Sequence, residues 1–398
     1  MHSTLHKTLA ILCLSAFISP ALDARDIYVD PSATGAGDGT SWVDAYTNMQ
    51  AAVSNANSVI MADNIHVAAG HYVSYFSYVI TDPCTVRSNG SGPVIFENIT
   101  ATRPVFEIDN TDIHFYDIEF QSSSTHVYGY RSGVRFDGCV FTHASLSSIV
   151  GDQCRLMQFE DCKFEQNASI GRGGAIMSSD SQLVTVHRCV FEQNNSSDHG
   201  GAVFCVNHIL PGRLECHDTR FVGNASARNG GAINLINTHA TLINNVLTLN
   251  DATCGGAIAF RCTAGLSSLH LVNTTVFRNQ AFHVGGIWRG PSMVGSTRCM
   301  IANSIIYNNA SSSTSVMRGQ LKQAPNSISH SCVDGWGSLP WLGFGMISSA
   351  PMLLPNGCPT VFSPCIDAGN AALCPVPLDI TGSPRVVGPN IDMGAYER

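Results

Sequence analysis

The chain has 398 residues, of which 44% are hydrophobic and only 13% are charged. This composition excludes a disordered chain, because it supplies enough apolar surface for a continuous core. The 29 acidic residues exceed the 21 basic ones, giving a net charge of −8. No basic run occurs, so nucleic acid is not expected as a partner. The 36 glycines favour a β protein with many turns.

The N-terminal segment has the pattern of an export signal. His2, His6 and Lys7 precede the apolar run LAILCLSAFI, and small residues follow up to Ala24. This pattern predicts a signal peptide over residues 1–24. No later segment has the length of a membrane span. We therefore expect a mature chain with no integral membrane segment, a monomer, in the extracellular space, at the cell surface or in the periplasm.

An amphipathic helix is predicted next, over about residues 41–57. Four apolar side chains occur at helical spacing, namely Trp42, Tyr46, Met49 and Val53. Ser41 and Asp44 resemble a capping box at its start. A helix at this place would cap the first coil of the repeat that follows, with the segment 64–72 as the first strand.

A repeat occupies the middle of the chain. Each copy has a strand centred on an apolar residue, with an asparagine three residues later and a glycine pair beyond it. The centres recur every 21 to 30 residues, at Phe120, Phe141, Phe164, Phe191, Phe221, Leu247, Phe277 and Ile306. A unit this short cannot bury itself, so the copies must stack into a solenoid. The LxxLxL pattern of leucine-rich repeats is absent, and propeller blades are longer. We predict an all-β, right-handed parallel β-helix over residues 25–310.

Stacking of the coils brings equivalent residues of successive copies into columns, and it predicts which side chains contact one another. The Phe residues should form an aromatic stack inside the coil, and Cys139, Cys162 and Cys189 should stack as buried thiols rather than disulfides. An asparagine ladder is predicted from Asn167, Asn194, Asn224 and Asn250. Three of these residues also lie in glycosylation sequons, but an inward asparagine could not carry a glycan.

The glycine pairs GGAIMS, GGAVFC, GGAINL, GGAIAF and GGIWRG begin at residues 173, 200, 230, 255 and 285. A phosphate-binding glycine loop would occur once, ahead of a helix. Five copies in step with the strands indicate tight bends and close packing of coil on coil.

The repeat ends near residue 310, and Pro, Gly and Cys become frequent. Residues 311–398 are predicted to be an irregular C-terminal region that caps the last coil and protects its strand edge. The cluster Cys358, Cys365 and Cys374 is a reasonable place for one disulfide, with an odd cysteine left over.

These motifs resemble known families. The pairing of GGA[IV] with FxxN resembles the repeat of chlamydial polymorphic membrane proteins. The segments IYVDPSATGAGDGTSW and SPCIDAGN…DITGSPRVVGPNIDMGAYE resemble exported bacterial β-helix proteins of the pectin-lyase-like superfamily with a choice-of-anchor-type C-terminal region. The resemblance implies a β-helix fold and export. Because no run of barrel strands follows the repeat, it implies a released or periplasmic protein, or one retained by a partner.

The two residues that directly precede each glycine pair form two columns of candidate site residues. Arg172 and His199 belong to one column, and Asp198 and Arg228 to the other. Stacking should bring these four side chains together on three consecutive coils. A base, a carboxylate and two guanidinium groups could bind an acidic sugar and act as a lyase site. Solvated turn residues would show the same pattern.

Trp288 and His283 are candidate ligand-binding residues. Trp288 replaces the small aliphatic residue that usually follows the glycine pair, and an exposed indole could stack on a sugar ring, although a buried Trp is the alternative. No cofactor or metal site is expected. Ca²⁺ at the end segments, through Asp30, Asp38, Asp367, Asp379 or Asp392, is an alternative to simple turn capping.

Fold does not settle the function of a β-helix. The sequence favours an exported binding, adhesive or structural protein, directed toward a polysaccharide or a cell-surface glycan or protein. The alternative is a polysaccharide lyase on an acidic glycan. A glycoside hydrolase has less support, because no pair of carboxylates was found on adjacent coils in one column.

Overall fold

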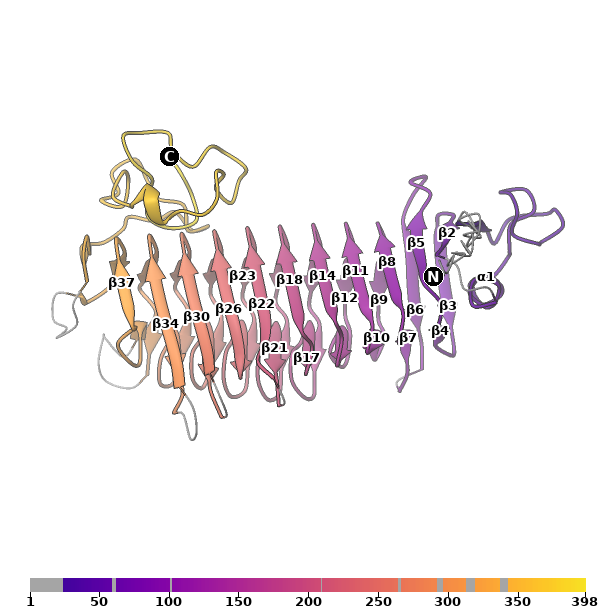
Figure 1. Cartoon of the computed structure of the whole chain (residues 1–398), viewed down its shortest axis with the longest axis horizontal. Helices are drawn as coiled ribbons and strands as arrows, with labels where there is room; N and C mark the ends of the chain where they lie inside the picture. The colour runs from indigo at the N-terminus through magenta and orange to yellow at the C-terminus, as the bar shows by residue number, and fades with distance from the viewer. Residues whose placement is uncertain are drawn as a thin grey trace, which may run out of the picture.

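The computed structural model shows a long β-helix whose successive coils stack along one axis (Figure 1). It describes residues 24–58, 62–100, 102–208, 210–263, 266–291, 296–312, 319–336 and 343–398. Every strand pairing between coils is parallel, and neighbouring strands in a sheet come from successive coils. The parallel β-helix predicted from the repeat is confirmed.

The β-helix has four sheets, of which A and B extend from its first coils to its last. Sheet A contains, in order, β1 (Asp26–Val29), β2 (Asp63–Val67), β5 (Cys84–Ser88), β8 (Asp112–Tyr116), β11 (Gly133–Asp137), β14 (Leu156–Glu160), β18 (Leu183–His187), β22 (Gly212–His217), β26 (Thr238–Ile243), β30 (Leu266–Val272), β34 (Ser296–Ala302) and β37 (Ser327–Ser329). Sheet B contains β3 (Gly70–Ser74), β6 (Val94–Asn98), β9 (Glu119–Gln121), β12 (Val140–Thr142), β15 (Lys163–Glu165), β19 (Val190–Glu192), β23 (Arg220–Val222), β27 (Val246–Thr248), β31 (Thr275–Phe277), β35 (Ile305–Tyr307) and β38 (Cys332–Val333).

The two remaining sheets extend over fewer coils, and sheet D begins only at β16. Sheet C contains β4 (Tyr78–Ile80), β7 (Pro104–Asp109), β10 (Thr125–Tyr130), β13 (Ile149–Asp152), β17 (Ile176–Ser179), β21 (Val203–Val206), β25 (Ile233–Ile236), β29 (Ile258–Arg261) and β33 (Ile287–Arg289). Sheet D is narrow, with β16 (Ala168–Ser169), β20 (Asn195–Ser196), β24 (Ala225–Ser226), β28 (Asp251–Ala252), β32 (Gln280–Ala281) and β36 (Ala310–Ser311).

The aromatic column inside sheet B is confirmed. The rings of Phe164 and Phe191 stack with centroids 4.6 Å apart and nearly parallel planes, and Phe191 stacks on Phe221 at 4.8 Å. The centroid separations match the spacing of neighbouring strands. These side chains are almost completely buried, so the column forms the centre of the apolar core.

One member of the predicted inward column of sheet B, Phe277, is wrong. Leu247 pairs with Val276, and Val276 pairs with Ile306, so Val276 is the inward residue of its coil. Phe277 faces the other side of β31, because successive residues of a strand alternate between faces. Asn279 lies three residues after Val276, which is the spacing seen in the other copies.

The asparagine ladder is confirmed and extends further than predicted. The Nδ2 of Asn194 donates to the Oδ1 of Asn224 at 2.9 Å and to the carbonyl oxygen of Phe164 at 3.0 Å. The same pattern continues through Asn250, Asn279 and Asn309. Each of these amides is buried, and each satisfies its neighbours on the next coil, as buried polar groups require. Asn167, Asn194 and Asn224 therefore point inward and are not free to carry glycans.

The glycine pairs have two separate roles. In the four pairs that begin at residues 173, 200, 230 and 255, the first glycine takes a left-handed conformation, with φ of 67° at Gly200, which residues with a side chain rarely adopt. The second glycine lies against the backbone of the next coil. A Cβ atom at Gly201 would lie 2.0 Å from the carbonyl oxygen of Gly231 and 2.5 Å from that of Ala225. The pairs thus set the bend and the close approach of coils.

The turn from sheet A to sheet B also needs left-handed backbone. Asp117, Asp161, Asp218 and Asn244 occupy equivalent turn positions with φ between 51° and 56°. Asp and Asn tolerate this conformation better than other side-chain residues. A row of polar turn residues therefore follows the edge of sheet A.

The N-terminal helix is shorter than predicted. Helix α1 spans Met49–Ala56, and the Asn48 side chain accepts a hydrogen bond from Ala51 N at its start. Ser41 and Asp44 hydrogen-bond each other as expected, but they close the loop ahead of the helix. The buried face of α1 includes Met49 and Val53. The first strand of the β-helix is β1, which precedes the predicted segment 64–72 and pairs with β2.

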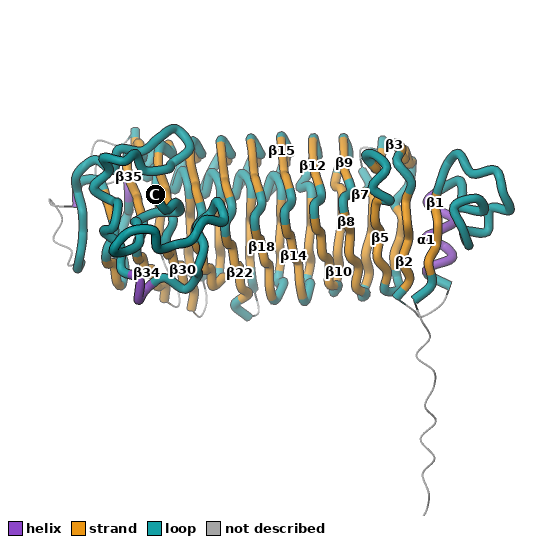
Figure 2. Tube along the Cα trace, turned by 90° about the horizontal axis from the view of Figure 1, so that it is seen from above, coloured by secondary structure: helices purple, strands orange, loops and turns teal. Residues whose placement is uncertain are grey.

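The C-terminal region lies along the side of the helix. The β-helix continues past residue 310 to β37 and β38, and the tail, residues 350–398, then folds back over the outer face of sheet B (Figures 1 and 2). Val246 and Ile305, which face outward from sheet B, are fully buried beneath it. Hydrogen bonds between Asn303 and Asn370 fasten the tail in place. The tail thus covers several coils rather than only the last one.

The thiols of the inner column are buried, as predicted. Cys139, Cys162 and Cys189 are at most 2% exposed, and none forms a disulfide in this structure. Burial, together with the thiol contact to Cys162, raises the pKa of Cys139. Residues 1–23, which hold most of the predicted signal peptide, lie outside the described residues. Among the described helices, none has both the length and the apolar character needed to cross a membrane.

Substitution of Asn194 by alanine should destabilise the stack. The change removes the amide that bonds Phe164 and Asn224 and the oxygen that accepts from Asn167. We expect the free energy of unfolding to fall by about 2–4 kcal/mol, measured by urea denaturation followed by circular dichroism. Asn195→Ala is the matched control, because that side chain is exposed. Equal stability of the two variants would contradict the ladder's role.

Candidate functional site

The structure brings together the four residues predicted from the columns before the glycine pairs. Asp198 lies at the turn after β20, and its carboxylate is 2.9 Å from Arg172 Nε and 3.4 Å from both His199 Nε2 and Arg228 Nε. Main-chain hydrogen bonds from Asp198 N to Gly171 O and from Arg228 N to Asp198 O confirm the predicted register. We call Arg172, Asp198, His199 and Arg228 the corner cluster.

The corner cluster pairs its carboxylate with guanidinium groups and encloses its imidazole. Burial alone would raise the pKa of Asp198, but the hydrogen bond from Arg172 and the nearby positive charges lower it below its ordinary value. Burial lowers the pKa of His199, which is 8% exposed. Asp198 is therefore an ion-paired carboxylate and His199 a neutral, enclosed imidazole. Arg228, whose side chain is 70% exposed, extends furthest into solvent.

Two members of the cluster cover an apolar side chain on the outside of sheet C. The Arg172 guanidinium lies 5.1 Å above the Phe204 ring, and the His199 ring lies roughly parallel to it. Phe204 is fully buried in a small outer cluster with Val206 and Ile236. The corner cluster therefore shields apolar surface as well as carrying charge.

The other two candidate residues lie elsewhere. Trp288 is 9% exposed and packs with Ala259 and Val284, and the Lys322 ammonium lies 4.6 Å above its ring. Trp288 is therefore the buried tryptophan that the sequence also allowed, and not an exposed indole, because its side chain faces a covered part of sheet C. His283 is exposed at a turn and contacts the Phe282 ring edge-on. The two residues do not join the corner cluster.

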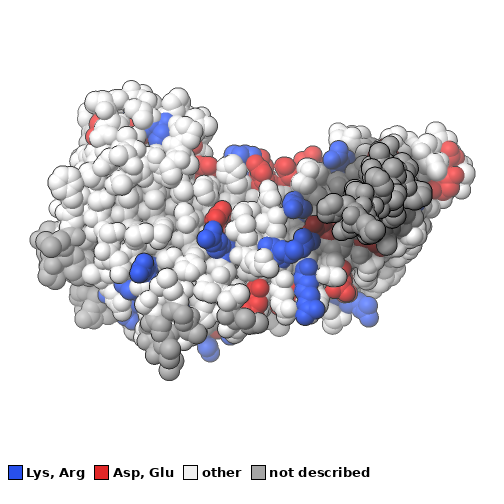
Figure 3. Space-filling model, in the orientation of Figure 1, with Lys and Arg blue, Asp and Glu red and all other residues white. Residues whose placement is uncertain are grey.

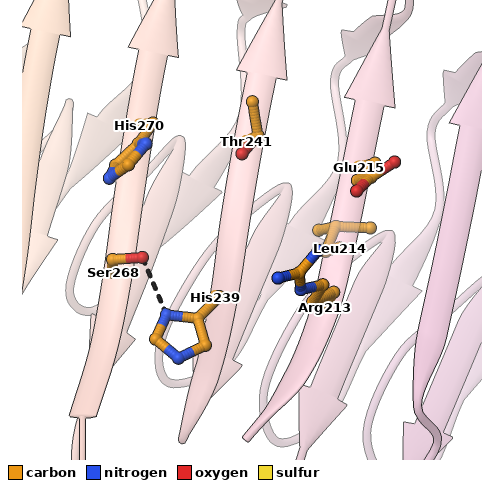
Figure 4. A pocket seen from close by; sticks show the side chains of 7 residues that line it. All are labelled: Arg213, Leu214, Glu215, His239, Thr241, Ser268 and His270. Carbon is orange, nitrogen blue, oxygen red and sulfur yellow. Dashed lines mark hydrogen bonds between the residues drawn. The ribbon is translucent and has the colours of Figure 1, made fainter.

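A second polar site occupies the outer face of sheet A (Figure 4). The register places Arg213, His239 and Ser268 in one row across β22, β26 and β30, and Glu215, Thr241 and His270 in the next. These six side chains line a shallow pocket of about 290 Å³. The His239 Nδ1 atom lies 2.8 Å from the Ser268 hydroxyl oxygen. We call this site the sheet A groove.

The groove is lined by neutral imidazoles beside one cation and one carboxylate. Burial and the neighbouring charge of Arg213 lower the pKa of His239, and burial and His239 lower that of His270. Both imidazoles are therefore uncharged at neutral pH and offer one donor and one acceptor each. A larger hollow of about 650 Å³ begins at Arg213 and extends past Gln182 to Arg131.

Sequence reasoning did not find the groove. The signal was nonetheless present. The inward residues Cys216 and Leu242 lie five positions before the repeat centres, so their neighbours on either side must face outward. Applying that alternation to β22 and β26 gives Arg213, Glu215, His239 and Thr241 as two outward rows.

Sheet A also carries a pair of carboxylates on adjacent coils, contrary to the sequence-based expectation. Asp137 pairs in register with Glu160, which pairs with His187. Arg188 bonds Glu160 at 2.7 Å and Asp161 at 2.6 Å. The pair was missed because the expected columns were drawn at the glycine turns and not along sheet A.

The environments of Asp137 and Asp161 shift the pKa values of these two acids in opposite directions. Burial and the charge of Glu160 raise the pKa of Asp137, and the hydrogen bond from Arg188 lowers that of Asp161. The hydrogen bond with Asp218 raises the pKa of His187. Figure 3 shows basic and acidic side chains interspersed near the middle of this face.

The end-segment carboxylates cap turns. Asp30 accepts from Ser32 N, Asp38 from Thr40 N, and Asp379 from Thr381 N. Within the described ranges, no three His, Cys, Asp or Glu side chains are arranged to hold a metal ion. Ca²⁺ at these segments stays an untested alternative.

Comparison with known proteins identifies the family. The sequence pattern described as "Right handed beta helix region" matches residues 69–276, so the chain belongs to the family of right-handed β-helix proteins. No curated protein matches it. A solved structure titled "Crystal structure of pectate lyase Pel9A" aligns over 95% of this chain and 98% of that one, with 13% identity and a TM-score of 0.44.

Proposed function

We propose that the protein is an exported glycan-binding protein that holds a polysaccharide or cell-surface glycan in the sheet A groove. The observation that carries this proposal is the two-row array of polar side chains across β22, β26 and β30. Ligand sites are concave and have a few placed polar groups, and the groove has both features. Its hydroxyls, imidazoles, guanidinium and carboxylate offer both donors and acceptors to sugar hydroxyls.

The shape of the surface also suits a chain-like ligand. Equivalent side chains on successive strands repeat at the strand spacing of about 4.8 Å, so a groove crossing several strands presents a repeating set of contacts. Arg213 belongs both to the groove and to the larger hollow beside it. The two depressions together give a glycan more than one sugar-sized position.

Export and surface association are part of the same proposal. They are supported by the charged residues, apolar run and small residues of the first 24 positions. A glycan partner outside the cytoplasm is consistent with that route.

Substitution of Arg213 or His239 by alanine should weaken glycan binding. The probe is the best-binding oligosaccharide from a glycan array, and its dissociation constant is measured by calorimetry. We expect affinity to fall at least about tenfold, because each change removes a polar partner worth roughly 1.4 kcal/mol or more. Because both groove imidazoles are neutral, affinity should stay constant from pH 8 down to about 6.5, the ordinary titration range of histidine.

Arg228→Ala is the matched control, since it removes an exposed arginine from the corner cluster instead. If Arg228→Ala abolishes binding and Arg213→Ala does not, the corner cluster and not the groove is the glycan site. Binding accompanied by unsaturated products that absorb ultraviolet light would establish the lyase alternative.

A second candidate function, glycoside hydrolysis, is favoured by the Asp137 and Asp161 environments. Enzymes that hydrolyse glycosides use one carboxylic acid and one carboxylate on either side of the bond. Asp137, with the raised pKa, would give its proton to the leaving-group oxygen as the carbon–oxygen bond breaks. The carboxylate of Asp161 would take a proton from the water whose oxygen joins the sugar carbon.

Asp137→Asn should separate hydrolysis from binding. If the face is catalytic, this change lowers the rate of reducing-end release by at least about 100-fold, while glycan affinity in the groove is kept. Asp109→Asn, on sheet C, is the control and should leave the rate unchanged. Release of no reducing ends by the unaltered protein, from a glycan that it binds, would exclude this candidate.

A further inference from the structure

The three cysteines of the tail lie in three separate places. Cys358 packs near Val246 and Ala395, and the Cys374 thiol contacts Arg385. Cys365 instead lies in a buried cluster with Cys332, Ile305 and Met393. The bridge expected within the tail is not present, because all three thiols are free in this structure. The cysteine that lies near Cys365 is therefore Cys332 of the β-helix and not another cysteine of the tail.

Cys332 and Cys365 face each other across the junction of tail and coil. Cys332 belongs to β38, where it pairs with Ile305 of β35 and faces outward from sheet B. Both side chains are fully buried, with 0% exposure. Both side chains belong to one buried cluster with Ile305 and Met393, and the neighbouring Cys365 thiol, together with burial, raises the pKa of Cys332. The Cys332 thiol also donates a hydrogen bond to the carbonyl oxygen of Ser349 at 3.4 Å.

The backbone holds both residues in place. Cys365 N donates to Ser363 Oγ at 3.2 Å, and its carbonyl oxygen accepts from Met393 N at 2.9 Å. Cys332 N donates to Ser304 O at 2.8 Å. Because both segments are already ordered, joining the two sulfurs costs little further conformational entropy.

We propose that Cys332 and Cys365 form a disulfide that fastens the C-terminal tail to the last coils of the β-helix. The inner-column thiols form no such bond. Cys139, Cys162 and Cys189 occupy successive strands with parallel side chains, and this arrangement does not give the dihedral angle that a disulfide needs. Cys332 and Cys365 come from two segments that meet face to face, with no shared strand register to hold their side chains parallel.

The chemistry needs a disulfide oxidant such as oxidised glutathione. The thiolate of one cysteine attacks the sulfur–sulfur bond of the oxidant and releases one reduced thiol. The second cysteine then displaces the other half, so two protein thiols become one disulfide and the oxidant leaves as two thiols. Since both cysteines are buried, exchange occurs when the tail lifts or before it docks.

The cross-link would stabilise the docked tail. It closes a loop from residue 332 to residue 365, which restricts the unfolded chain. The outer residues Val246 and Ile305 of sheet B stay covered only while the tail is docked. In the cell the bond depends on the proposed export to an oxidising environment, whereas a test in a defined redox buffer does not.

Disulfide mapping of the full chain tests the proposal. The purified protein is incubated with oxidised and reduced glutathione, free thiols are alkylated, and the peptides are identified by mass spectrometry. We expect a Cys332–Cys365 linked peptide, with two fewer hydrogen atoms than its reduced parts, and loss of the link in Cys332→Ser and Cys365→Ser. Cys358→Ser is the matched control and should keep the link.

Limited proteolysis provides the second measurement. Oxidised protein should lose its tail at least about tenfold more slowly than reduced protein, and this difference should vanish in Cys332→Ser. Complete alkylation of either thiol after oxidation, or linkage of Cys365 to Cys358 or Cys374, would overturn the proposal. Glycan affinity serves as the separate readout of the proposed function, because the sheet A groove lies away from the tail and should bind equally in both redox states.

Discussion

Main-chain hydrogen bonding between successive coils is the constraint on which the structure depends. Each coil uses its neighbours to satisfy the backbone of its strands, and the coils must approach to strand spacing for those bonds to form. The second glycine of each pair makes this approach possible at the tightest corner, where Gly201 lies against the carbonyl oxygen of Gly231. A side chain there would force the coils apart.

The same constraint produces order along the whole molecule. Once the coils are in register, every position in the repeat becomes a column. Inward columns become the Phe stack and the asparagine ladder, in which each amide satisfies the next coil. Outward columns become rows of polar side chains, and this is how Arg213 and His239 come to line one groove. Site geometry on this protein is therefore inherited from the register of its core.

Much of the fold could be predicted from sequence because the repeat is periodic. The Phe and Asn columns, the buried thiols and the register of the corner cluster all follow from nearly constant offsets within each copy, although the copies differ in length. Errors arose where the spacing was ambiguous by one residue, as with Phe277 and Val276. The sheet A groove was missed because its residues vary in chemistry from coil to coil, and only their alternation with the inward column reveals them. The position of the tail on sheet B could not be predicted, because Asn303 and Asn370 meet through tertiary packing that no repeat encodes.

The central claim is that close contact between coils at the glycine pairs sets the register. The most direct test is the unfolding free energy of Gly201→Ala compared with Gly171→Ala. Gly171 lies just before the glycine pair that begins at Gly173, but a Cβ atom at Gly171 would meet only the Ser169 hydroxyl, at 3.7 Å. The account predicts a loss of about 3 kcal/mol or more for Gly201→Ala and a change within about 0.5 kcal/mol for Gly171→Ala. A Gly201→Ala protein as stable as the unaltered chain would contradict it.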